Sequence, residues 1–135
     1  MKLLTKNSDY AIRALAVLAD NKERFVSARE ISEKQNIPYQ FLRRILRRLI
    51  LNKLVVSREG GRGGFKINAD PKKASIIDVI KIFQGNLQLS DCMFRRKICR
   101  NRPHCVLRRE IKRVEQIVAK EFEGITLARL LKTHK

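Results

Sequence analysis

The sequence predicts a mainly α-helical chain with one small β-hairpin and a long helix near its C-terminus. Three observations support this prediction: three short helical patterns within the first 52 residues, two short strand patterns around a glycine-rich turn, and an apolar spacing of four, three and four residues after residue 105. With 135 residues, of which 44% are apolar, the chain can bury one modest core. We expect one globular domain, or one domain with a dimerisation arm.

The charge of the chain indicates a partner of opposite charge. Thirty-one Lys and Arg residues against thirteen Asp and Glu give a net charge of +18, which predicts binding to a polyanion or to an anionic membrane surface. Nucleic acid is the better prediction, because no apolar run approaches the roughly 18 residues that span a bilayer. The opening MKLLTKNSDY has no apolar core of signal-peptide length, so we expect a cytoplasmic protein without a membrane partner.

The first two helices are predicted from their apolar spacing and their capping residues. The run DYAIRALAVLAD has apolar residues at helical spacing, and Ser8 or Asp9 stands at its start as the expected cap. This helix should be largely buried. Ser27 and Glu30 have the spacing of a capping box, which predicts a short second helix from about Ala28 to Gln35.

The third helix is the most informative surface of the sequence. After a turn at Asn36 and Ile37, Pro38 opens the run PYQFLRRILRRLILN at a position where its missing amide proton costs nothing. At about 100° per residue, one side of this helix is apolar and the other is basic. The apolar side contains Leu42, Ile45, Leu46 and Leu49, and the basic side contains Arg43, Arg44, Arg47 and Arg48. A short helix, a tight turn and a second helix with a basic face form the helix-turn-helix arrangement, whose second helix enters the major groove of DNA.

Two strand patterns follow the third helix. LVVSR and FKIN flank EGGRGG, a turn that requires glycine, and together they predict a β-hairpin, or wing. Arg58 and Arg62 near its tip are expected to reach phosphates or a narrow minor groove. Helix, turn, helix and wing in this order favour a winged helix-turn-helix over the alternative of a solvated basic helix and an ordinary hairpin. We expect base edges to be contacted by Tyr39, Gln40, Arg43 and Arg44, and phosphates by Arg47 and Arg48.

Three further helical patterns are separated by one segment without a period. Ser75 and Asp78 form a second capping box for SIIDVIKIF, which ends at Gly85. A long helix from about Cys105 ends at Gly124 and precedes the short helix ITLARLL, which Thr126 caps. The apolar seam of the long helix contains Leu107, Ile111, Val114 and Val118, with Ile117 and Phe122 beside it. A helix of about 17 residues is poorly stable alone in water, so the seam is expected to pack on a partner chain; the alternative is packing on its own domain.

All three cysteines lie in or beside a basic segment that has no helical or strand period. Cys92, Cys99 and Cys105 cannot all pair within one chain, and in a reducing compartment such a cluster indicates metal or redox chemistry. Zinc fingers pair their ligands in CxxC units, which are absent here, whereas widely spaced thiolates suit an iron–sulfur cluster that takes a fourth ligand from elsewhere. His104 is a candidate, although its adjacency to Cys105 makes joint coordination of one metal awkward. A zinc site of three cysteines and a histidine, and a reactive thiol switch without metal, remain alternatives.

Several motifs together resemble a known family. They are LTK and DYAIRAL near the start, ISEKQNIPYQFL in the helix-turn-helix, KLVVSREGGRGGF at the wing, SIIDVI after it, the three cysteines, and ITLARLL near the end. Nearly the whole chain resembles the winged-helix bacterial regulators that include the iron–sulfur regulator IscR, the nitric-oxide sensor NsrR and the iron regulator RirA. The resemblance implies a homodimer in which the long helix exchanges between subunits, and a cluster whose loss or damage changes operator affinity.

The resemblance also implies a set of cluster ligands. IscR-like members have a histidine three residues after the third cysteine, where this sequence has Arg108. NsrR-like members can use an aspartate near the N-terminus of the partner subunit, and Asp9 occupies the corresponding position. The resemblance therefore implies a cluster, 4Fe-4S in preference to 2Fe-2S, on Cys92, Cys99, Cys105 and the partner's Asp9. An ordinary role for Asp9 as a first-turn acid of its own helix is the alternative.

From these features we expect a dimeric, sequence-specific transcription regulator, acting as a repressor, that senses nitric oxide, redox state or iron supply through an iron–sulfur cluster. Residues 1–84 would form the winged helix-turn-helix DNA-binding domain, residues 85–105 the cluster-binding loop, and residues 106–135 the dimerisation helix and the short C-terminal helix. A two-fold dimer predicts a pseudo-palindromic double-stranded operator. The alternatives are a regulator with structural zinc or a metal-free thiol switch, and a generic RNA-binding or architectural protein. An enzyme is not expected, because the sequence has no Ser, His and acid arrangement and no phosphate loop.

Overall fold

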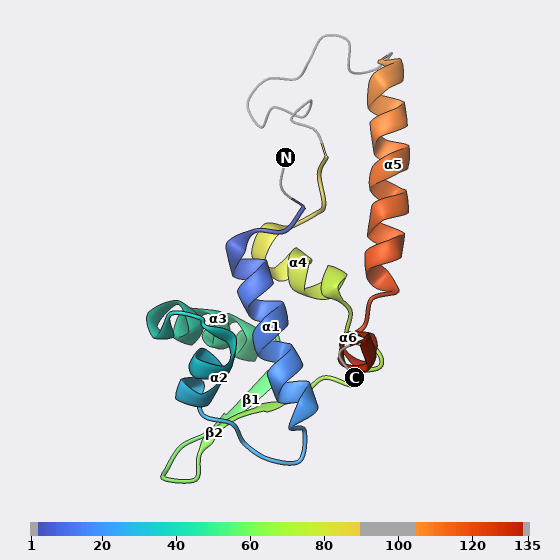
Figure 1. Ribbon diagram of the computed structural model, residues 1–135. Coiled ribbons are helices and arrows are strands. Elements are labelled where there is room, and N and C mark those ends of the chain that lie inside the picture. The colour runs from blue at the N-terminus through green and yellow to red at the C-terminus, as the bar shows by residue number, and fades with distance from the viewer. Residues whose placement is uncertain (1–2, 90–104, 134–135) are drawn as a thin grey trace.

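The computed structural model describes residues 3–89 and 105–133, and these residues form six helices and two strands. In chain order they are α1 (Lys6–Asp20), α2 (Ala28–Gln35), α3 (Tyr39–Leu51), β1 (Val55–Arg58), β2 (Gly64–Ile67), α4 (Ile76–Gln84), α5 (Val106–Glu123) and α6 (Leu127–Thr133). The first four helices, the hairpin and α6 gather into one body, and α5 extends away from it (Figure 1). The predicted mainly α fold with a small β-wing is confirmed. Among the described residues, no helix is both long and apolar enough to cross a membrane.

The centre of the body is α1, which packs against α2, α3, α4, α6 and β2. Ala11, Ala14 and Leu18 are fully buried on its inward face, and Leu42 and Leu46 of α3 belong to the same buried cluster. Burial of a leucine side chain contributes about 1.5–3 kcal/mol. The apolar side of α3 is therefore fixed against α1, which leaves its basic side in solvent.

The start of α1 differs from the prediction. The helix begins at Lys6, and its N-cap is Thr5, whose hydroxyl accepts a hydrogen bond from the amide of Ser8 at 3.3 Å. The expectation that Ser8 or Asp9 caps this helix was wrong, because the chain turns helical three residues earlier. Ser8 is instead buried within the first turn, and Asp9 is the acidic residue of that turn.

The α2 helix has the predicted bounds, but only half of its capping box. Ser27 caps it by accepting a hydrogen bond from the amide of Glu30 at 3.1 Å. The Glu30 carboxylate does not return the bond to Ser27, since it pairs with Arg24 at 2.7 Å and with Lys34 at 3.3 Å. The helix ends at Asn36 in a left-handed conformation with φ of 53°, which makes the predicted tight turn.

The hairpin lies directly after α3 and is antiparallel. Val55 pairs with Ile67 and Arg58 pairs with Gly64, which fixes the register along both strands. A short third segment joins the sheet through an isolated bridge between Val26 and Phe65, with backbone hydrogen bonds of 2.8 and 2.7 Å. The wing is thus attached both to α3 by sequence and to the connection between α1 and α2 by hydrogen bonds.

The C-terminal part of the chain leaves the body and returns to it. The predicted capping box of α4 is confirmed by a 3.0 Å hydrogen bond from the Ser75 amide to the Asp78 carboxylate. After α5, the backbone before α6 pairs with the backbone before α4 at Ser75 and Thr126, and Leu127 is fully buried. The predicted cap of α6 is also confirmed, since the Thr126 hydroxyl accepts a hydrogen bond from the Arg129 amide at 3.1 Å.

The α5 helix contacts α4 but has no buried residue in the single chain. Its predicted bounds hold, with Cys105 as the N-cap and Gly124 as the C-cap. Several residues of the apolar seam remain in solvent: Leu107 is 63% exposed, Val114 39% and Ile117 50%. Ile111 and Val118 are half-buried, so within one chain its own domain covers the seam only in part.

Candidate nucleic-acid interface

The exposed face of α3 carries the four arginines that the sequence placed there. Leu42, Ile45, Leu46 and Leu49 are buried, and Arg43, Arg44, Arg47 and Arg48 are exposed. Pro38 occupies the N-cap of this helix rather than its first helical position, so α3 starts at Tyr39. Tyr39 and Gln40 consequently lie in the first turn, where residues of a recognition helix reach base edges.

An open hollow of about 360 Å³ lies between this face and the wing. It is lined by Gln40, Arg43, Arg44 and Arg47 on α3, by Ile50, and by Phe65 of β2. Its three charged side chains are all arginines, whose guanidinium groups bind phosphate and guanine through paired N–H donors. The hollow therefore has the charge and the hydrogen-bonding groups of a DNA-binding surface.

Exposed aromatic rings lie against the arginines at the start of α3. The Tyr39 ring has the guanidinium carbons of Arg29 and Arg43 at 5.9 Å from its centroid, and the Phe41 ring has that of Arg44 at 4.9 Å. Such contacts hold a cation without neutralising it. Arg29 and Phe41 were not among the residues predicted from the sequence for this surface. For Arg29, a basic residue in the first helix of a helix-turn-helix was a usable signal.

Arg48 differs from the other three arginines because it is held by α4. Its Nη2 donates a 2.6 Å hydrogen bond to the carbonyl oxygen of Ile82, and its guanidinium lies 4.9 Å from the centre of the Phe83 ring. The neighbouring Gln84 side chain accepts a hydrogen bond from the Thr5 amide at 2.9 Å and donates one to the Leu3 carbonyl at 3.2 Å. The end of α4 thus connects the recognition helix with the N-terminal segment.

The predicted cluster ligands are only partly described. Cys92, Cys99 and His104 lie outside the described residues, and Cys105 is half-buried at the N-cap of α5. Asp9 is exposed and forms an ion pair with Arg13 at 3.2 Å. Within residues 3–89 and 105–133, no group of three or more His, Cys, Asp or Glu side chains could hold a metal ion. No described contact therefore brings Asp9 and Cys105 together in one chain.

The ends of the cysteine-bearing segment are both joined to α5. The chain enters the segment through Leu89, whose amide donates a 2.8 Å hydrogen bond to the Glu115 carboxylate. It leaves the segment at Cys105, the residue that begins the helix. The cysteine-bearing segment thus follows α4 in the chain and leads directly into α5.

Glu30, in the first turn of α2, is the one group among the described residues whose pKa is lowered. The hydrogen bond from the Arg24 guanidinium lowers the pKa of Glu30 from its ordinary value of 4.5, and the Lys34 ammonium acts in the same direction. The same contact raises the pKa of Arg24. Glu30 is therefore ionised at neutral pH and holds Arg24 beside the start of the helix-turn-helix.

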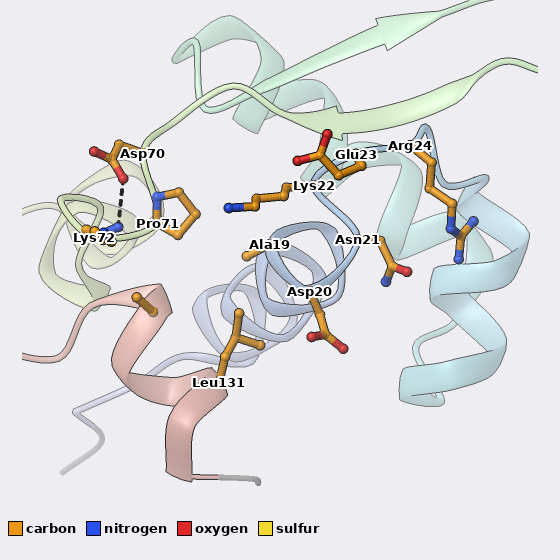
Figure 2. Close-up of a pocket in the computed structure, with 11 residues that line it drawn as sticks. Ala19, Asp20, Asn21, Lys22, Glu23, Arg24, Asp70, Pro71, Lys72 and Leu131 are labelled. Carbon is orange, nitrogen blue, oxygen red and sulfur yellow. Dashed lines mark hydrogen bonds between the residues drawn. The ribbon is translucent and has the colours of Figure 1, made fainter.

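A larger hollow of about 580 Å³ lies elsewhere, between the end of α1, the segment before α4, and α6 (Figure 2). None of the predicted DNA-binding or cluster residues lines it. Its charged lining residues balance, with the acidic Asp20, Glu23 and Asp70 against the basic Lys22, Arg24 and Lys72. This balance distinguishes it from the hollow beside α3, where the charges are all positive.

A buried apolar core behind an exposed basic recognition helix, followed by a wing, defines a winged helix-turn-helix DNA-binding protein. The profile of the Rrf2 family, described as iron-dependent transcriptional regulators, matches residues 4–133. The chain belongs to this family, which confirms the expected kinship with IscR and NsrR. Its members are transcriptional regulators and not enzymes.

Two relatives show the extent of the sequence similarity. A protein of Aquifex aeolicus named as an HTH-type transcriptional regulator is 30% identical over 125 residues, which are 90% of this chain and 86% of that protein. The HTH-type transcriptional regulator NsrR of Halalkalibacterium halodurans is 28% identical over 130 residues, which are 95% and 89% of the two chains. The similarity thus extends beyond the DNA-binding half.

Two solved structures show the same fold. IscR of T. potens superposes with a TM-score of 0.81 at 24% identity and covers 100% of this chain and 89% of that one. CymR, the global cysteine regulator of B. subtilis, superposes with a TM-score of 0.83 at 20% identity and covers 98% of both chains. At these identities the likeness establishes the winged-helix architecture with its long helix.

Proposed function

We propose that this protein is a dimeric repressor that binds a pseudo-palindromic DNA operator and senses nitric oxide, redox state or iron supply through an iron–sulfur cluster. The observation that carries the DNA-binding part is the arginine-lined hollow between α3 and the wing. In this proposal α3 enters the major groove, and Arg58 and Arg62 of the wing contact the adjacent backbone or minor groove.

The α3 residues divide into two groups in this proposal. Tyr39, Gln40, Arg43 and Arg44 contact base edges, because they lie in the first two turns of the recognition helix. Arg47 contacts phosphate. For Arg48, which we expected on phosphate as well, the hydrogen bond to the Ile82 carbonyl supports a different role, in which it joins α3 to α4.

The uncovered seam of α5 supports the homodimer. Leu107, Val114 and Ile117 lie on a helix that projects from the body with no buried residue (Figure 1). Pairing the seams of two chains would remove these side chains from water, and a two-fold axis would place two α3 helices on two half-sites. In this proposal residues 1–84 bind DNA, residues 85–105 hold the cluster and residues 106–135 contain the dimerisation helix. The short helix α6 belongs to the last range, but it packs on the DNA-binding body through Leu127.

The donor set fits an iron–sulfur cluster. Thiolate sulfur is the usual ligand of such clusters, and the three cysteines stand among arginines whose positive charge favours the thiolate form. Cys92, Cys99 and Cys105 would hold the cluster, and Asp9 of the partner subunit would be the fourth ligand. A bound cluster supplies iron that reacts with nitric oxide and with oxidants. Asp9 would have to exchange its exposed ion pair with Arg13 for that role.

The hydrogen bonds at the end of α4 support a connection between the cysteine segment and the recognition helix. Leu89 is held by Glu115 on α5, and five residues earlier Gln84 is held by the N-terminal segment that leads into Asp9. Arg48 completes the connection from Ile82 to α3. Reorganisation of the segment would therefore alter the position of α3, and a differential binding energy of about 1.4 kcal/mol is a tenfold change in affinity.

The second candidate is a regulator that senses thiol state without iron, with structural zinc as a further variant. The half-buried, unpaired Cys105 and the fold shared with the global cysteine regulator CymR favour it. In this case the reactive group would be a cysteine thiolate among arginines. Iron and sulfide analysis distinguishes the two candidates.

The DNA-binding proposal is tested by selection from a random duplex pool with the full-length protein. We expect enrichment of an inverted repeat whose half-sites are centred about one helical turn, or a multiple of it, apart. Enrichment of single-stranded RNA in a parallel selection, or no sequence preference among duplexes, would contradict the proposal and favour a generic nucleic-acid-binding protein.

A further inference from the structure

Phe25 lies against the wing although it belongs to neither strand nor helix. The guanidinium carbon of Arg58 is 4.1 Å from the centre of its ring, and the ammonium of Lys66 is 5.5 Å from it. The ring is half-buried and occupies the connection between α1 and α2. Phe25 and Arg58 are 33 positions apart in the chain, so the contact depends on the tertiary fold.

The backbone beside Phe25 explains why the ring is held there. Val26 exchanges hydrogen bonds of 2.8 and 2.7 Å with Phe65, which attaches the segment to β2. The close approach requires glycine at position 64, whose φ is +152° and whose Cβ would lie 2.6 Å from the Val26 carbonyl oxygen. The position of Phe25 is therefore set by the backbone hydrogen bonds of the neighbouring Val26 to β2, and not by side-chain packing alone.

Arg58 has a second restraint from its own hairpin. Its Nη2 donates a 3.1 Å hydrogen bond to the carbonyl oxygen of Arg62. Within the described ranges Arg58 forms no salt bridge, so its positive charge is not cancelled by a carboxylate. A ring below and a carbonyl at the side fix the guanidinium while leaving it charged.

We infer that Phe25 is a positioning residue that holds Arg58 in place for contact with DNA. An unrestrained arginine loses rotamer freedom when it binds, and that loss weakens the contact. The ring of Phe25 restrains Arg58 before the DNA arrives, so part of this loss is already incurred on folding. The inference rests on the proposed contact between the wing and DNA.

The test compares duplex affinities by fluorescence anisotropy at several salt concentrations, using the full-length protein and the selected operator. Phe25→Leu keeps an apolar side chain but removes the aromatic face, and Phe25→Tyr keeps the face. Phe25→Tyr is therefore the matched control, because it changes the same position without removing the aromatic face. Thermal unfolding of each variant separates a loss of binding from a loss of folding.

We expect Arg58→Ala to weaken binding and to lower the salt slope by about one. Phe25→Leu should weaken binding about two- to fivefold, the factor expected of an exposed cation–π contact. The Phe25→Tyr control should bind like wild type. Because Phe25 acts through Arg58, adding Phe25→Leu to Arg58→Ala should cause no further loss.

Two results would overturn the inference itself, and a third would overturn the contact between Arg58 and DNA on which it rests. Equal losses from Phe25→Leu in the presence and absence of Arg58 would show that the ring acts independently. Wild-type binding by Phe25→Leu, with Arg58→Ala impaired, would show that the restraint has no effect on affinity. Wild-type binding by Arg58→Ala would show that Arg58 does not contact DNA, which would remove the positioning role and leave the proposed wing contact to Arg62.

Discussion

A substitution at Gly64 tests how the wing is attached to the body. Gly64→Ala introduces a Cβ 2.6 Å from the Val26 carbonyl oxygen, at a φ of +152° that side chains rarely adopt. Backbone strain of this kind costs about 1–3 kcal/mol. The methyl group would also separate Val26 from Phe65, and the two backbone hydrogen bonds between them contribute about 1 kcal/mol each.

These contributions sum to about 3–5 kcal/mol of lost stability for Gly64→Ala if both bonds break. At about 4 °C per kcal/mol for a domain of this size, Tm should fall by at least about 10 °C. Circular dichroism during heating measures the shift. Affinity for the operator should fall as well, because Phe25 and Arg58 depend on the same attachment.

Gly61→Ala is the matched control in the same hairpin, since a Cβ at Gly61 meets nothing within 4 Å. Its Tm should stay within about 2 °C of wild type, the range of ordinary surface substitutions. If Gly64→Ala unfolds at the same temperature as Gly61→Ala, the contact between the wing and Val26 does not stabilise the fold and the reasoning fails.

Three further predictions concern the recognition helix α3, the proposed dimer and the α2 helix. Arg43→Ala should cost about 1–3 kcal/mol of operator binding at a single base position, whereas equal weakening on all sequences would assign Arg43 to phosphate; Arg113→Ala on α5 is the control. Ile117→Asp should convert the proposed dimer to a monomer in light scattering while the adjacent, exposed Gln116→Asp does not, and a dimeric Ile117→Asp would show that another surface pairs the chains. Because the pKa of Glu30 is lowered in the folded state, its contribution to stability is present above the ordinary value of 4.5 and is lost as the pH falls through the lowered pKa. Urea unfolding of Glu30→Gln should therefore show a loss of stability at neutral pH that disappears in acid, and a difference independent of pH would contradict this cause.

Most helices and strands were predicted correctly, because apolar spacing, capping residues and turn glycines are each contained in a few consecutive residues. The basic and apolar sides of α3, the glycine turn and the caps at Ser27, Ser75 and Thr126 are each encoded within a few residues. The start of α1 was predicted wrongly because several neighbouring residues can cap the same helix. Thr5, Ser8 and Asp9 are all good capping residues, and only the folded chain shows that the helix starts after Thr5.

Long-range contacts could not be predicted from one sequence. Helical spacing placed Arg48 with the exposed arginines, but its hydrogen bond to Ile82 joins residues 34 positions apart. The contact of Phe25 with Arg58 has the same origin. For the candidate cluster site, the sequence supplies the residue types and the spacing of the proposed ligands, whereas the proposed fourth ligand, Asp9, would come from a second chain.

The iron content of anaerobically purified protein tests the proposed sensor most directly. The measurement is iron and acid-labile sulfide per chain, together with operator affinity before and after exposure to nitric oxide. We predict a coloured protein containing both elements, an operator affinity that changes on exposure, and loss of the visible absorbance in Cys99→Ala. A colourless wild-type protein that contains no iron or sulfide and binds its operator equally well before and after nitric oxide would contradict the account.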